Sequence, residues 1–209
     1  MIQNLKVRIH FSQLLFIPIM FILLTVGILR AQDMESRAVI TRFTLSGTSD
    51  RSEPPGYKIY SSLAFSGGIR YYIIPPLAAE LTIAVESREV DFEAENNREI
   101  SLGSIDYLAF VLVLQYHLPL EGVLSPCGGL GINFNRYFEK SGAVNELGVP
   151  NSFGFTVQLG IDIDLSSVFF FTADVELNQM EVKLIDNGRE LSRIMVHPAS
   201  FSLGIGAKF

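Results

Sequence analysis

The chain has 209 residues, 48% of them hydrophobic, and a formal net charge of −6 at pH 7. An acidic chain is a poor partner for nucleic acid, because binding to phosphates depends on Lys and Arg. The single cysteine, Cys127, excludes an intramolecular disulfide.

The amino-terminal stretch has the features of a secretory signal peptide. Lys6 and Arg8 precede the apolar run Leu14–Leu29, and a positive segment before a short apolar one is typical of such signals. The run is shorter than the roughly 20 residues that a membrane-spanning helix needs. We predict a signal peptide over residues 1–31, with an uncleaved helical anchor as the alternative. Its removal takes away three basic residues and no acid, so the charge of the predicted mature domain, residues 32–209, falls from −6 to −9.

The predicted mature domain alternates apolar and polar residues with a period of two, which indicates β-strands. Each segment is long for a strand in an ordinary globular protein and suits one that crosses a bilayer at a tilt. The eight predicted strands cover residues 38–46, 59–72, 78–90, 100–116, 124–136, 152–164, 168–183 and 193–209.

The connections between these strands alternate in length. Short turns are expected at residues 73–77, 117–122 and 165–167, the first two with Pro, and longer polar loops at residues 47–56, 91–98, 137–150 and 185–190. Short turns on one side and long loops on the other are the layout of an outer-membrane barrel. An even number of strands then places both termini on the periplasmic side.

Each strand has an apolar row and a polar row, and two folds explain this. In a soluble sandwich or lipocalin-like barrel the apolar row is the core, whereas in a membrane barrel it faces lipid. We favour lipid because the apolar rows are nearly uninterrupted, a signal peptide is predicted, and the apolar row of the segment 193–209 continues up to Phe209. The predicted fold is all-β, an eight-stranded antiparallel up-and-down transmembrane β-barrel in contact with outer-membrane lipid.

If the apolar rows face lipid, the charged rows face the lumen and must pair with one another or with water. They either lock the barrel as a salt-bridged plug or line a narrow path. The predicted lumen charge cluster is Arg42, Arg70, Glu80, Glu86, Arg88, Asp162, Asp164, Asp174, Glu176 and Lys208. Two of its carboxylate pairs, at 162/164 and 174/176, resemble cation ligands, but no ligand loop accompanies them and we predict no metal.

The segment Tyr107–Tyr116 is apolar on both faces, so its period does not show which face looks inward. We predict that its larger side chains supply the apolar wall of a channel. That wall consists of Tyr107, Phe110, Leu112, Leu114 and Tyr116.

Residues suited to catalysis are scarce. His197 has Ser192 and Ser200 nearby in the same segment, but neighbours along one strand do not make a triad. The Gly-rich run Pro126–Phe134 lacks the Lys-Ser/Thr of a phosphate-binding loop. We therefore predict no enzyme activity and no cofactor.

Four stretches resemble the OmpW family of small outer-membrane proteins. They are "YYIIPPLAAELTIA" (71–84), "GVLSPCGGLGINF" (122–134), "SFGFTVQLGIDIDLSS" (152–167) and "VHPASFSLGIGAKF" (196–209). The resemblance implies a monomeric eight-stranded barrel with a hydrophobic channel that admits small apolar molecules and releases them sideways into the membrane. The chain departs from the family in having no Trp, and in having Cys127 where an aromatic residue is more usual.

The segment 193–209 also resembles the terminal signal by which the barrel-assembly machinery recognises its clients. The residues of this predicted signal are Phe201, Leu203, Ile205 and Phe209. We predict an outer-membrane barrel for passive transport of small hydrophobic solutes. The alternative is a sealed structural barrel whose extracellular loops bind partners.

Overall fold

The computed structural model describes residues 37–47, 50–53, 57–60, 62–93, 99–186 and 188–209. The predicted signal peptide, residues 1–31, lies outside this part of the chain. No helix among the described residues has the length and apolar character to cross a membrane.

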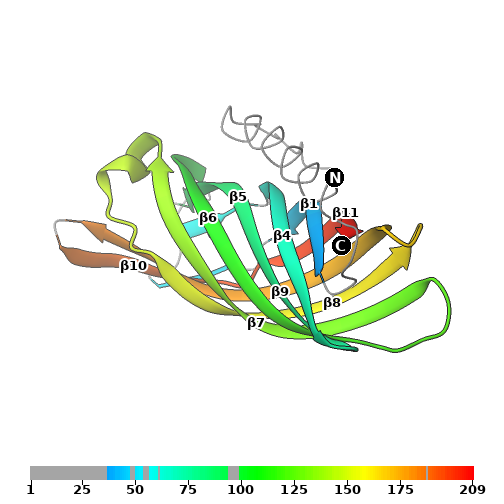
Figure 1. Ribbon diagram of the computed structural model, residues 1–209. Coiled ribbons are helices and arrows are strands. Elements are labelled where there is room, and N and C mark those ends of the chain that lie inside the picture. The colour runs from blue at the N-terminus through cyan, green and yellow to red at the C-terminus, as the bar shows by residue number, and fades with distance from the viewer. Residues whose placement is uncertain (1–36, 48–49, 54–56, 61, 94–98, 187) are drawn as a thin grey trace.

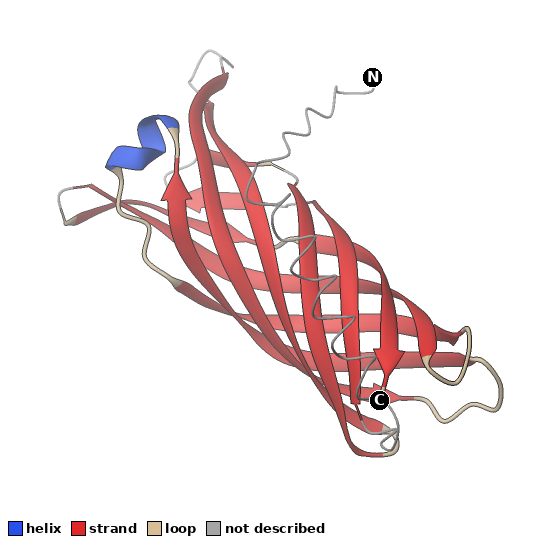
Figure 2. Ribbon diagram, turned by 45° about the horizontal axis from the view of Figure 1, so that its top comes forward, coloured by secondary structure: helices blue, strands red, loops and turns tan. Residues whose placement is uncertain are grey.

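The described strands close into an antiparallel barrel (Figures 1 and 2). The ring closes because β11 pairs with β1 on one side and with β9 on the other. Its eight strands are β1 (Arg37–Gly47), β4 (Ser62–Ile74), β5 (Leu77–Glu93), β6 (Glu99–His117), β7 (Leu124–Lys140), β8 (Ser152–Asp164), β9 (Phe169–Asp186) and β11 (Ala199–Lys208). The predicted strand count and antiparallel order are confirmed.

Three shorter strands extend the wall at one end: β2 (Asp50–Glu53), β3 (Tyr57–Ile59) and β10 (Arg189–Val196). β10 pairs with β9 on one side and with β2 on the other, while β3 pairs with β5. The predicted strand 193–209 is therefore two strands, β10 and β11. The break falls at His197 and Pro198, because proline has no N–H to donate to the ladder.

The two ends of the barrel differ as the sequence predicts. The tight turn at Pro75–Pro76 lies at the same end as Arg37 and Phe209, whose backbones hydrogen-bond to each other at 2.9 and 3.2 Å. The 3₁₀ helix η1 (Gly142–Glu146) lies at the opposite end, blue in Figure 2. Short turns mark the periplasmic end of an outer-membrane barrel, so η1 belongs to the extracellular end.

The apolar row of each strand faces outward. On β8, Phe153, Phe155 and Leu159 form the outer row and are 73%, 70% and 67% exposed.

 The alternate positions Gln158 and Asp162 are buried, at 2% and 3% exposure. A polar interior and an apolar exterior are the reverse of a soluble barrel and the arrangement of a membrane barrel. The soluble alternative is therefore wrong for this chain.

Candidate functional site

A layer of buried charges crosses the lumen near its periplasmic end. Arg42 binds Glu80 through Nη1 at 2.6 Å and Asp174 through Nε at 2.9 Å. Arg70 binds Glu80 through Nε at 2.9 Å and also donates to Asp162. These five side chains come from β1, β4, β5, β8 and β9, and their exposure is 3% or less. We call these residues the charged layer; its ion pairs link opposite walls of the barrel.

Amide side chains extend the charged layer across β6 and β8. Gln115 Nε2 donates to Gln158 Oε1 at 2.7 Å and to Glu80 Oε2 at 3.2 Å. Gln158 in turn donates to Glu176 at 3.4 Å. The predicted lumen charge cluster omits both glutamines because they carry no charge, although the place of Gln158 in the polar row of its strand was a signal for it.

The other predicted lumen charges form separate groups. Lys208 Nζ pairs with Asp164 at 2.6 Å on the periplasmic side of the charged layer. Further toward the extracellular end, Arg88 Nη2 binds Glu86 at 2.5 Å and Arg88 Nε donates to the Tyr107 hydroxyl at 2.8 Å. The predicted charges therefore all lie on the lumen side of the wall, but in three levels instead of one cluster.

The predicted apolar channel wall on β6 needs correction. Only Tyr107 is buried inside; Leu112, Leu114 and Tyr116 are 47%, 50% and 49% exposed on the outer surface, and Phe110 shares their face. The prediction was wrong for these four residues because both faces of β6 are apolar. The size of a side chain therefore did not indicate whether it points into the lumen or toward lipid. The inward apolar positions of β6 are instead Ile105, Tyr107, Ala109, Val111 and Val113.

Apolar side chains fill the lumen on the extracellular side of the Arg88–Glu86 pair. We call this cluster the apolar compartment; its buried members are Ile59, Val90, Ile105, Tyr107, Ala109, Val144, Met180, Val182, Leu184, Ile194 and Val196. Most of them come from the extracellular parts of β5, β6, β9 and β10, while Val144 belongs to η1. The free cavity beside Arg88 and Tyr137 measures only about 10 Å³, roughly the room for one water molecule.

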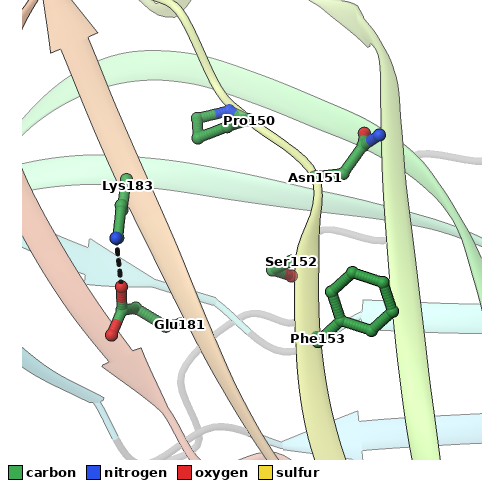
Figure 3. A pocket seen from close by; sticks show the side chains of 6 residues that line it. All are labelled: Pro150, Asn151, Ser152, Phe153, Glu181 and Lys183. Atoms are coloured by element: carbon green, nitrogen blue, oxygen red, sulfur yellow. Dashed lines mark ion pairs between the residues drawn. The ribbon is translucent and has the colours of Figure 1, made fainter.

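The wall beside the apolar compartment is split between β8 and β9. The ladder of these strands ends at Gly154 and Met180, and the next backbone pairing in the described part of the chain is the bridge between Gly148 and Ile185. A pocket of about 330 Å³ occupies the split (Figure 3). It is lined by Pro150, Asn151, Ser152, Phe153, Glu181 and Lys183.

The pocket has a polar and an apolar side. Lys183 Nζ and Glu181 Oε1 pair at 3.0 Å on its β9 side, while the Phe153 ring lies on its β8 side (Figure 3). Ser152 is buried and accepts from Asn135 Nδ2 at 3.3 Å. The pocket thus reaches from the outer surface to a side chain that contacts the lumen.

The family model described as OmpW matches residues 38–209, nearly the whole of the described barrel. The chain belongs to the OmpW family. OmpW-family barrels are generally channels rather than enzymes, and the protein is located in the outer membrane.

Individual relatives of this OmpW-family chain are distant. It is 29% identical over 116 residues to the dibenzothiophene metabolism operon protein PahQ of Pseudomonas aeruginosa, a match that covers 53% of this chain and 54% of PahQ. The match to the outer membrane protein AlkL of Ectopseudomonas oleovorans is 28% identical over 111 residues and covers 51% of this chain and 47% of AlkL. The chain thus matches about half the length of these relatives.

A solved structure shares the fold. The crystal structure of the outer membrane protein OprG from Pseudomonas aeruginosa superposes with a TM-score of 0.70 at 21% identity, covering 85% of this chain and 99% of OprG. The likeness supports the barrel architecture of this OmpW-family protein.

The remaining predicted residues lie at the carboxyl-terminal side of the barrel. Phe201, Leu203 and Ile205 are 48%, 40% and 47% exposed on the outer face of β11, and Phe209 follows that strand. Their role as an assembly signal stays a prediction. His197 is exposed, whereas Ser192 and Ser200 are buried, so the structure does not bring these three residues together.

Proposed function

We propose that this OmpW-family barrel is a narrow passage for small hydrophobic molecules and has no enzyme activity. The observation that carries the proposal is the apolar compartment, which lies on the extracellular side of the charged layer. Buried apolar surface stabilises an apolar solute by roughly 25 cal/mol per Å² removed from water. An ion gains nothing there and loses its hydration.

The charged layer supports a path that does not run straight through the barrel. Arg42 and Arg70 hold their carboxylate partners across the lumen, and parting them leaves buried charges without partners. The split between β8 and β9 lies beside Val182, a member of the apolar compartment. A solute that leaves sideways through this split reaches lipid without disturbing the ion pairs of the charged layer.

The name of PahQ supports the class of solute. It refers to the metabolism of dibenzothiophene, a small uncharged aromatic molecule. We propose solutes of the same kind, apolar and of a few rings, for this chain.

The test is the rate at which intact Gram-negative cells take up naphthalene, with and without the protein in their outer membrane. We expect faster uptake with the protein and no added uptake of naphthalene sulfonate, which is charged. Val182→Thr keeps the shape of the side chain but adds a hydroxyl to the apolar compartment, and should lower the gain. Val175→Thr, the same change at an exposed position on the outer face of β9 and outside the pocket, is the matched control.

The sealed barrel makes the opposite prediction. If folded protein in the outer membrane leaves naphthalene uptake unchanged, the passage is disproved. Retained folding is checked by the shift in gel mobility between unheated and boiled samples.

A further inference from the structure

The connection between β7 and β8 fills the apolar compartment with its own side chains. We call residues 141–151 the lid. Val144, on η1, is 0% exposed inside the apolar compartment, and Leu147 and Val149 pack against the same cluster. Among the described residues, the cavity between Val90, Tyr107 and Val182 has a free volume of only about 10 Å³ with the lid in place, much less than an aromatic solute fills.

The lid is attached to the barrel at its start. Ser141 N donates to Ser104 O at 2.9 Å, and the two serine hydroxyls lie 2.9 Å apart. Gly142 has a φ of +67°, and a Cβ at this position would lie 2.5 Å from the carbonyl oxygen of Leu102. Only glycine fits this close approach, which directs the following turn of η1 over the mouth of the barrel.

A second attachment holds the far side of the lid. Gly148 N donates to Ile185 O at 2.7 Å, and Ile185 N donates to Gly148 O at 2.8 Å. This bridge also borders the split between β8 and β9. Release of this pair of hydrogen bonds would therefore loosen the lid next to Val144 and widen the split at the same time, while Lys140 Nζ still donates to the Leu147 carbonyl oxygen.

We propose that Val144 occupies the place of the solute and sets the size of the molecules that the barrel admits, with the Gly148–Ile185 bridge as the latch. This inference rests on the proposed function. An apolar solute replaces the contacts that Val144 gives up, because both bury apolar surface against the same side chains. A polar molecule makes no such replacement, so the lid stays closed to it.

The first test fixes the Gly148–Ile185 bridge in place with a disulfide. A Cβ built on Gly148 lies 3.4 Å from the Cβ of Ile185, close to the separation in disulfides. The double variant Gly148→Cys/Ile185→Cys is made in a Cys127→Ser background, and the bond is verified by mass spectrometry. Naphthalene uptake should fall to the rate of cells without the protein when the bond forms, and return on reduction. Each single cysteine variant is the matched control.

The second test changes the size of the side chain at position 144 and needs no disulfide. Uptake of naphthalene is compared with uptake of dibenzothiophene, which is larger, for Val144→Ala and Val144→Phe. We expect Val144→Ala to favour the larger solute relative to the parent chain, and Val144→Phe to disfavour it. Glu146→Ala, in the same turn, should leave the ratio unchanged.

The outcomes separate the two proposals. If the Cys127→Ser parent folds but takes up no naphthalene, the proposed function fails. If the parent takes up naphthalene while the verified disulfide and both Val144 variants leave uptake and solute ratio unchanged, the lid is not a gate and the inference is overturned.

Discussion

Loss of the Arg70 guanidinium tests whether the charged layer is a sealed structural plug. Arg70 is 1% exposed, pairs with Glu80 and Asp162, and lies 5.5 Å from the centre of the Phe170 ring. In Arg70→Met the carboxylates stay buried without this partner, which costs about 3–5 kcal/mol. We expect the free energy of unfolding to fall by about that amount.

The measurement is denaturant unfolding of the protein in lipid vesicles, followed by circular dichroism because the chain has no Trp. Arg37→Met is the matched control, since Arg37 is exposed and its loss should cost only about 0–1 kcal/mol. Adding Asp162→Asn to Arg70→Met removes the negative charge of a carboxylate that has lost its arginine partner. The double variant should therefore recover part of the lost free energy of unfolding. A loss of less than about 1 kcal/mol in Arg70→Met would refute the argument, because it would mean that water reaches these carboxylates.

Two further predictions concern the wall of the barrel. Gly131→Ala should destabilise the fold or prevent it, because its Cβ would lie 2.3 Å from the carbonyl oxygen of Leu112. Gly128→Ala should fold, because its Cβ meets the Leu159 side chain at 3.4 Å and the Gln158 carbonyl oxygen at 3.8 Å, which are ordinary contacts. Equal yields of the two folded variants would contradict this. Leu159→Lys, at a position 67% exposed on the outer face of β8, should lower the free energy of unfolding by about 2–4 kcal/mol in lipid, against about 0–1 kcal/mol for Leu120→Lys in a periplasmic turn. Equal losses would show that Leu159 does not face lipid.

The sequence was most informative where one face of a strand differs from the other. In β8 the alternation of Phe155 and Val157 with Thr156 and Gln158 determines the outward face, because side chains of a strand point to opposite sides in turn. The same reasoning failed on β6, where both faces are apolar. There the direction of Tyr107 and Leu112 follows only from the register with β5 and β7.

What the sequence determined by itself is the class of the molecule: long two-faced strands, turns of alternating length and an outward apolar surface, all local properties of period and turn chemistry. Only the tertiary structure decided which inward groups meet. Arg70 and Asp162 are 92 residues apart and Arg42 and Asp174 are 132 apart, and closure of the ring makes them neighbours. Val144 shows the same limit, because its burial inside the barrel depends on how its loop folds back and not on its place in a pattern.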